Sequence, residues 1–376
     1  MKFTIDRSLL FEHLTNAIKV ISPRNTMPVL SGIKLEISNS QLTIVGSDSD
    51  MSIELTIPTQ NEEEQIIEVT TPGAIVLPGK FFVDIIRKLP GDDVTIESKE
   101  NNHAIIKSKS AEFNVTGVDP DQYPLLPEVS KEESIELPIS LLKKIINQTS
   151  FAVSSSETRP ILTGVLFETS GNTLKFTATD SHRLAYREVT IEQSLPELKH
   201  VIPGKAFVEL SKVIDEHDDP IQISFANNQV LFEYNELKFI SRLLEGNYPD
   251  TSRLFPDQYE TKIDVNKDLL LKSTERASLL AKEAGNHVTK ISVKDQIVEI
   301  SANSPEVGET KETVDVNSID GEEIKLNFNS KYMMDALKSV DDDHVVIEFS
   351  GTMKPFIIKP QSTDDLKQLI LPIRSY

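Results

Sequence analysis

The feature that most constrains the fold of this chain is an internal repeat. Four segments of its first third recur, in the same order, in its middle third. They are residues 24–33, 42–50, 76–81 and 122–124, which match residues 158–165, 174–182, 201–206 and 247–249. The last two pairs read VLPGKF with VIPGKA and QYP with NYP, each displaced by 125 residues. Four matches in one order indicate duplicated structural units.

A fainter third copy follows. Residues 329–335 (NSKYMMD) align with residues 78–84 (PGKFFVD), and Lys331 lies 126 residues after Lys205. Units of about 125 residues have the usual size of a domain. We predict three domains, at residues 1–127, 128–254 and 255–376, joined at the Pro-containing stretches 125–128 and 254–257.

Each copy shows the same order of elements. A strand leads into a helix with apolar residues at helical spacing, alternating strands follow, and a second helix begins before further strands close the unit. The predicted helices cover residues 7–21, 80–88, 140–152, 205–214, 266–283 and 330–340. The pattern predicts an α+β fold in which every repeat packs two helices against antiparallel sheets.

Charge is distributed unevenly along the chain. Its net charge of −20 argues against a protein that holds nucleic acid by an overall positive field. The six predicted helices nevertheless sum to +8, so the remainder carries −28. Lys and Arg are good helix formers, which explains part of this difference. Because a repeat can place equivalent helices around one axis, the partition also fits a mildly basic helical surface that faces a phosphate backbone.

Motifs of catalysis and cofactor binding are missing from the sequence. It has no glycine-rich nucleotide motif, and its seven histidines include no metal-binding pair. Asp180, Ser181 and His182 are the residue types of a hydrolase triad, but neighbours on one strand point to alternating faces. Asp48 and Asp50 would share a strand face and suit a weakly held cation, although a solvated turn explains them better. We expect no enzyme, no cofactor and no metal.

Membrane and export signals are also missing. No apolar run approaches the ~20 residues that span a bilayer, and the opening MKFTIDRSLLF resembles a strand and a helix rather than a signal peptide. The chain has no cysteine and hence no disulfide framework. We expect a cytoplasmic protein without a membrane partner.

Motifs along the whole chain resemble the bacterial replicative sliding clamp, the β subunit of DNA polymerase III. They are the opening MKFTI, PRNTMPVL at 23–30, TDSHRL at 179–184 and LPIR at 371–374; DPDQYP at 119–124 and GTMKPF at 351–356 are typical of Gram-positive members. The resemblance implies three DNA-clamp domains and a head-to-tail homodimer that closes into a ring, with helices lining the hole. Such a ring is a processivity factor: it encircles duplex DNA without reading its sequence and tethers replication proteins to it.

The resemblance also implies two kinds of site. Arg24 matches a DNA-contacting position, and the helix lysines Lys80, Lys143, Lys205 and Lys331 are further candidates. A pocket for short Leu/Phe-rich segments of partners would be formed by Leu162, Thr179, His182, Arg183, Leu184, Pro249, Arg253, Leu254, Asn329, Tyr332, Met353, Pro355, Leu369, Leu371, Pro372, Ile373 and Arg374. The implied partners are the DNA polymerase III α subunit, the clamp loader, and other polymerases and repair proteins.

Two alternatives stay open at this point. One is an acidic three-domain scaffold that binds peptides but encloses no DNA. The other is a cytoplasmic hydrolase of unknown class, which the missing catalytic motifs disfavour.

Overall fold

The computed structural model describes residues 1–22, 27–62, 64–127, 129, 133–226, 228–256, 258–283 and 287–374. Its contacts form two compact units. Unit 1 contains residues 1–142 and 206–243, and unit 2 contains residues 143–205 and 244–376, so the middle repeat contributes to both.

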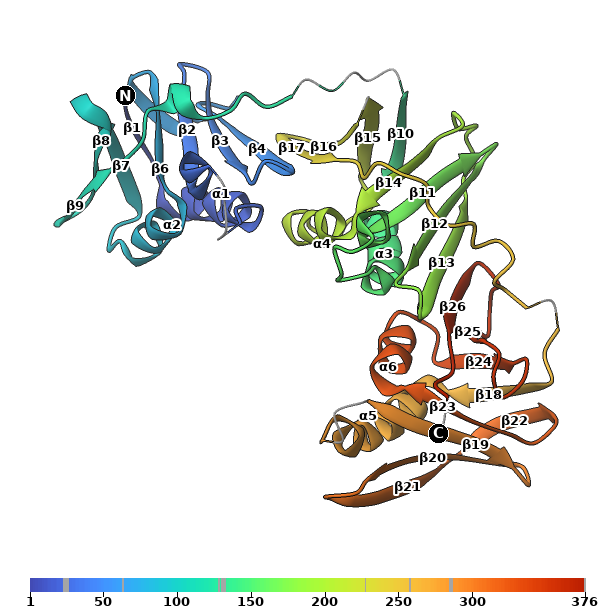
Figure 1. The fold of residues 1–376 in the computed structure, drawn as a ribbon. Helices are drawn as coiled ribbons and strands as arrows, with labels where there is room; N and C mark the ends of the chain where they lie inside the picture. Colours follow the sequence, from blue (N-terminus) through green and yellow to red (C-terminus); the bar gives the residue numbers. More distant parts are fainter. Residues whose placement is uncertain are drawn as a thin grey trace. The chain divides into compact units, whose positions relative to one another are not determined.

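Each repeat consists of two successive motifs of one strand, one helix and three strands (Figure 1). In the first repeat these are β1 (Lys2–Asp6), α1 (Arg7–Lys19), β2 (Gly32–Ile37), β3 (Gln41–Ser47) and β4 (Met51–Pro58), then β6 (Gly73–Pro78), α2 (Gly79–Lys88), β7 (Asp93–Ser98), β8 (His103–Ser108) and β9 (Ala111–Thr116), with β5 (Ile67–Thr71) inserted between them.

In the middle repeat the motifs are β10 (Glu133–Pro138), α3 (Ile139–Thr149), β11 (Gly164–Ser170), β12 (Thr173–Thr179) and β13 (Arg183–Thr190), then β14 (Lys199–Pro203), α4 (Gly204–Val213), β15 (Pro220–Ala226), β16 (Gln229–Tyr234) and β17 (Leu237–Arg242). Short 3₁₀ helices, η1 (Pro28–Ser31) and η5 (Pro160–Thr163), precede β2 and β11.

In the third repeat they are β18 (Thr261–Asn266), α5 (Lys267–Glu283), β19 (Val288–Lys294), β20 (Ile297–Ser304) and β21 (Gly308–Val314), then β23 (Ile324–Asn329), α6 (Ser330–Lys338), β24 (His344–Phe349), β25 (Phe356–Pro360) and β26 (Leu366–Ile370), with β22 (Val316–Gly321) inserted. The α+β prediction is confirmed, and all six predicted helices form with ends shifted by at most three residues. No helix among the described residues is both long and apolar enough to cross a bilayer.

The sheets run across the joints between repeats. Unit 1 contains an eight-stranded sheet, β10-β15-β16-β17-β4-β3-β2-β6, and a five-stranded sheet, β5-β1-β7-β8-β9. Unit 2 contains a nine-stranded sheet, β14-β11-β12-β13-β26-β25-β24-β18-β22, and a four-stranded sheet, β21-β20-β19-β23. The middle repeat therefore joins the first through β17 and β4, and joins the third through β13 and β26.

Helix α1 illustrates how the sequence builds these elements. The Asp6 carboxylate caps the helix by accepting a hydrogen bond from the Leu9 N–H, at 2.8 Å. Leu10, Leu14 and Ala17 then follow at helical spacing and are fully buried. Burying each leucine side chain contributes about 1.5–3 kcal/mol, so packing on the sheet supplies most of the helix's stability.

Two equivalent turns correct the sequence-based placement of the acidic residues. Asp180, Ser181 and His182 lie in the turn between β12 and β13, not on a strand, and Asp48 and Asp50 lie in the matching turn between β3 and β4. The physical reason is local. Each first aspartate accepts hydrogen bonds from backbone N–H groups two and three residues ahead, and the following serine has a positive φ, 80° in one turn and 76° in the other. Asp48 and Asp50 therefore belong to a turn, which is the explanation that the sequence favoured over a cation site.

Candidate peptide and nucleic-acid interfaces

The joint between the middle and third repeats brings the C-terminal residues against β13. There Leu184 pairs with Leu369 across the strands. Beyond β26, the Leu371 N–H donates to the His182 carbonyl at 2.9 Å, and the Ile373 N–H donates to the Asn327 carbonyl at 2.8 Å. The terminal segment described by the structure is therefore held by backbone hydrogen bonds on both sides.

Arg183 is fixed inside this joint. Its guanidinium donates to Asp180 at 3.0 Å, to Asp335 at 2.7 Å and to the Phe151 carbonyl at 2.5 Å, and lies 4.5 Å from the centre of the Tyr332 ring. The residue is only 8% exposed. All three nitrogens are engaged within the protein, so Arg183 connects helix α6 of the third repeat to the turn before β13. It is not placed to hold a peptide by its guanidinium.

The seventeen residues expected to form the peptide pocket all belong to unit 2 and fall into three classes of exposure. Buried ones are Leu162, Thr179, Arg183, Leu184 and Leu369; half-buried ones are Asn329, Tyr332, Pro355, Pro372 and Ile373; exposed ones are His182, Pro249, Arg253, Leu254, Met353, Leu371 and Arg374. Leu254, Met353 and Leu371 are 46%, 56% and 36% exposed. Exposed apolar side chains beside buried ones are typical of a surface that receives apolar groups.

A cavity of 520 Å³ lies beside these residues but includes only Pro249 from the expected set. Its walls are strands of the middle repeat, the segment that leads into the third repeat, and Lys367 of β26, with Tyr186, Tyr248 and Phe255 among the lining residues. Tyr248 donates to the Thr177 carbonyl and accepts from the Thr179 N–H at 3.1 Å, and burial raises the pKa of its hydroxyl. Sequence analysis missed Tyr248 and the Arg183 partner Asp335. The repeated QYP and NYP segments were the available signal for the tyrosine.

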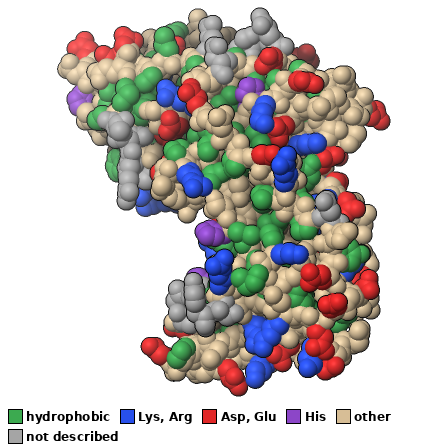
Figure 2. All heavy atoms as spheres, turned by 45° about the vertical axis from the view of Figure 1, so that its right-hand side comes forward, with side chains coloured by type: hydrophobic (Ala, Val, Ile, Leu, Met, Phe, Trp, Pro, Cys, Tyr) green, Lys and Arg blue, Asp and Glu red, His purple; other side chains and the backbone are tan. Residues whose placement is uncertain are grey.

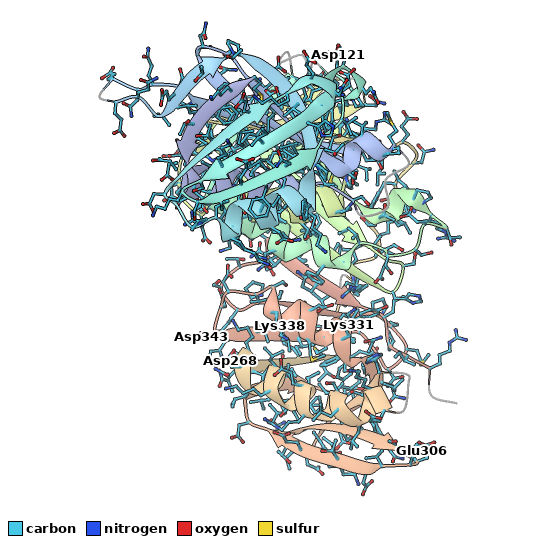
Figure 3. All side chains as sticks on the ribbon, turned by 90° about the vertical axis from the view of Figure 1, so that its left-hand side faces the viewer. Asp121, Asp268, Glu306, Lys331, Lys338 and Asp343 are labelled. Carbon is cyan, nitrogen blue, oxygen red and sulfur yellow. The ribbon has the colours of Figure 1, made fainter. Side chains whose placement is uncertain are left out.

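Three lysines occupy one equivalent position in the three repeats. Lys80, Lys205 and Lys331 are each the second residue of a second helix (α2, α4 and α6), and all three are exposed. A cation at a helix N-terminus opposes the helix dipole, so these helix-start lysines do not serve helix stability. At the start of α6 the backbone N–H groups of Ser330, Lys331 and Tyr332 are already bonded, to the His287 carbonyl and the Asn329 side chain. The attraction of an anion such as phosphate there would therefore come from the charge of the lysine. Figure 3 shows Lys331 at the start of α6 and Lys338 at its end.

The other DNA candidates are placed differently. Lys143 is half-buried on α3, and Arg24 lies outside the described residues. The six helices, with their observed bounds, retain the net charge of +8 inside a chain of −20. On the face drawn in Figure 2, basic and acidic side chains are interspersed. Among the residues that the structure describes, no three His, Asp or Glu side chains are grouped to hold a metal ion.

Within the part of the chain that the structure describes, the pattern of the joints leaves two strand edges without a matching strand. At each internal joint, the last strand of one repeat's first motif pairs with the last strand of the next repeat: β4 with β17, and β13 with β26. By this rule β21 of the third repeat and β9 of the first are unmatched, and both are the edges of their sheets. Large exposed apolar side chains lie on or near these edges: Phe113 on β9, Phe81 on α2 and Leu279 on α5, which are 38%, 57% and 68% exposed.

Comparison with known proteins gives one consistent result. Family models of the DNA polymerase III beta subunit match in order: the N-terminal domain at residues 1–127, the central domain at 136–250 and the C-terminal domain at 252–374. The chain is 53% identical to the beta sliding clamp of Staphylococcus epidermidis and 52% identical to that of Staphylococcus aureus, each over the full length of both chains. It is also similar to the crystal structure of the Bacillus subtilis DNA polymerase sliding clamp, with a TM-score of 0.96, 44% identity and full coverage of both chains.

Proposed function

We propose, from the premise that this chain belongs to the family of bacterial DNA polymerase III β subunits, the sliding clamps, that it closes head-to-tail with a second copy into a ring around duplex DNA. The family is one of non-catalytic processivity factors, which act with DNA, polymerase and clamp loader. Neither the peptide scaffold without DNA nor the hydrolase fits that membership. We place its action in the bacterial cytoplasm, where the chromosome is copied.

The observation that carries the ring is the pair of unmatched strands. A heterologous contact that joins β21 of one copy to β9 of the next repeats the rule of the internal joints, and it closes when the rotation permits. Two copies of three repeats give six similar joints. We propose domain boundaries after residues 127 and 254, which the ranges of the matching family models support.

The helices support the same contact. At the first internal joint, the Lys19 ammonium of α1 donates to the Lys212 carbonyl of α4 at 2.6 Å, so a first helix lies beside the second helix of the following repeat. The same rule sets α5 beside α2 of the next copy, which brings the exposed Leu279 and Phe81 to one interface. Association would remove their apolar surface from water.

We propose further that the DNA contacts are made without base readout by Arg24, Lys143 and the helix-start lysines, since enclosure requires only modest phosphate attraction. The second-joint pocket of the seventeen residues above would receive Leu/Phe-rich segments of the DNA polymerase III α subunit, the clamp loader, and other polymerases and repair proteins. The engaged guanidinium of Arg183 assigns that residue to supporting the pocket rather than to touching the peptide.

The function is tested by loading the protein onto nicked circular DNA with a matching clamp loader and ATP, then cutting the circle once. Retention on the intact circle with release after cutting is the expected result, because topology holds a ring on DNA. Retention after cutting, with free DNA ends, would show direct grip and contradict enclosure.

The contact between copies is tested with Leu279→Asp. Two joints of a dimeric ring would each lose a buried leucine, at about 1.5–3 kcal/mol apiece, so the dimer should weaken by roughly 10²–10⁴-fold in sedimentation analysis. Leu125→Asp is the matched control, because Leu125 is 91% exposed and lies outside this edge. A Leu279→Asp protein that dimerises like the control would refute the proposed contact.

A further inference from the structure

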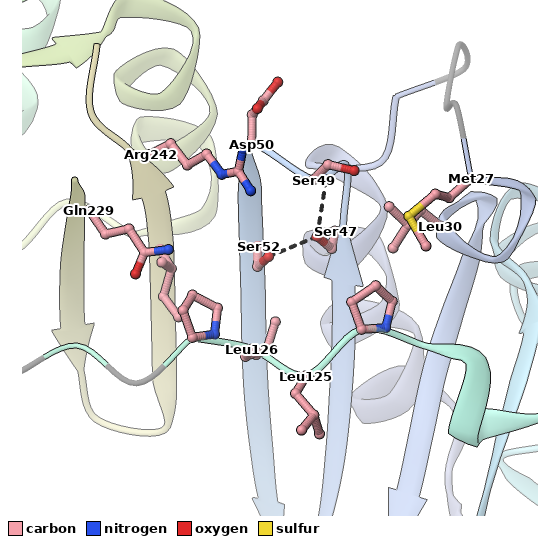
Figure 4. A pocket seen from close by; sticks show the side chains of 13 residues that line it. Met27, Leu30, Ser47, Ser49, Asp50, Ser52, Leu125, Leu126, Gln229 and Arg242 are labelled. Atoms are coloured by element: carbon pink, nitrogen blue, oxygen red, sulfur yellow. Dashed lines mark hydrogen bonds between the residues drawn. The ribbon is translucent and has the colours of Figure 1, made fainter. Parts of the chain in front are cut away.

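A second cavity, of 290 Å³, lies at the joint between the first and middle repeats (Figure 4). Its buried lining includes Leu30 from η1 and Ile240 from β17, which are 1% and 7% exposed. Its exposed lining includes Ser49 and Asp50 from the turn after β3, and Arg242 at the end of β17. The cavity thus has an apolar interior and a polar, charged rim.

The repeat places this cavity where the second joint has its proposed peptide pocket. Leu30 in η1 corresponds to Leu162 in η5, since PVLS and PILT occupy the same position before a strand. Strand pairing supplies the other correspondences. Ser52 stands opposite Ile240 at the first joint, as Leu184 stands opposite Leu369 at the second.

Two residues beyond Ile240 and Leu369, the strands again correspond. Arg242 follows Ser241, the last residue of β17 that pairs with β4, as Leu371 follows Ile370 at the end of β26. Arg242 is exposed, and its guanidinium makes no ion pair or hydrogen bond within the part of the chain that the structure describes. Figure 4 shows Arg242 directed to the top of β4, whereas the Asp50 carboxylate points away from the cavity. An unpaired, planar cation at the rim selects a carboxylate, which it can hold by two parallel hydrogen bonds.

We propose that this first-joint cavity is a second peptide-binding site, one that takes a short segment carrying a leucine or phenylalanine next to an aspartate or glutamate. The apolar side chain enters toward Leu30 and Ile240, and the carboxylate pairs with Arg242. The inference rests on the proposed function in one respect, because the equivalent pocket supplies the class of occupant. It differs in chemistry, because an arginine stands where the second joint has Leu371.

The six methionines offer a direct readout. Met27 lines the first-joint cavity, and Met353 belongs to the residues proposed for the second pocket. In full-length protein with ¹³C-methyl methionine, assigned by single Met→Leu substitutions, the acetylated peptide Glu-Asp-Leu-Phe-Glu should shift the Met27 methyl resonance saturably. The matched peptide Lys-Ser-Leu-Phe-Lys, which the acidic protein attracts non-specifically, should shift it far less. Arg242→Gln should weaken the acidic peptide's effect on Met27 about three- to tenfold, and Arg242→Glu should abolish it.

The two sites are separated by their reporters. Neither Arg242 substitution should change the Met353 response. A Met27 methyl that stays unmoved, that responds equally to both peptides, or that responds unchanged in Arg242→Glu would overturn the proposal. Silence at Met27 with a normal response at Met353 would overturn it while leaving the second-joint pocket standing; silence at both would overturn it and count against that pocket too.

Discussion

Arg183→Met places at the second joint the residue that the chain itself uses at the first, because Met51 pairs with Ser241 there as Arg183 pairs with Ile370. The substitution keeps an unbranched apolar stem but removes three hydrogen bonds from the guanidinium. It leaves Asp180 and Asp335 without their cation, at 14% and 28% side-chain exposure.

The expected cost follows from that burial. Breaking a buried ion pair by removing one partner costs about 3–5 kcal/mol, and the partial exposure of Asp335 favours the lower end. We therefore expect the free energy of opening between β13 and β26 to fall by about 3 kcal/mol. Since about 1.4 kcal/mol corresponds to a factor of ten, amide exchange in β26 should accelerate roughly 150-fold.

Hydrogen exchange is the suitable assay because a chain of several domains does not unfold in one step. Strand β17 is the internal control, since its joint contains Met51 and should exchange at an unchanged rate. Adding Asp335→Asn should restore part of the protection by removing an unpaired charge, which a double-mutant cycle quantifies. Acceleration of β26 by less than about threefold, or equal acceleration of β17, would refute this account of the joint.

Three further predictions concern the other surfaces. The Arg276 guanidinium bonds Glu312 in a bidentate fashion, with one distance of 2.9 Å, and holds the pKa of that carboxyl below its usual 4.5. The stabilisation that this ion pair gives to the contact of α5 with β21 is therefore present above pH 4.5 and is lost as the pH falls through the lowered pKa. Arg276→Gln should move the Glu312 titration, followed by ¹³C NMR, back toward 4.5. Reversing the three helix-start lysines to Glu should shorten retention on circular DNA and flatten its salt dependence while peptide affinity stays constant; unchanged retention would exclude these lysines from the DNA contact. Deleting residues 371–376 should weaken Leu/Phe-rich partner peptides measured by fluorescence anisotropy without opening the dimer, and unaltered peptide binding would remove the C-terminal segment from the pocket.

Sequence periodicity and the internal repeat were sufficient to predict the fold class and all six helices, because both depend on local spacing of apolar residues. The turn at Asp180–His182 was placed wrongly on a strand, since the hydrogen bonds of one aspartate to the backbone ahead override the alternation of a strand. The role of Arg183 depends on Asp335, which lies 152 residues away, and only the folded chain brings the two together. The first-joint cavity escaped prediction for the same reason: its walls come from η1, β3, β4, β16, β17 and the segment at residues 124–127.

The joints between repeats differ in connectivity more than in structure. Two of them unite strands of one polypeptide, so the linker keeps each separated strand at a high effective concentration near its partner. The proposed β21–β9 joint lacks such a tether, and its occupancy depends on how many copies the solution contains. A ring made of like contacts would then part at its two untethered joints first. A protein that opens the ring then has to compete with association only at those two joints. The covalent connectivity of the chain thus determines which joints of the ring can open.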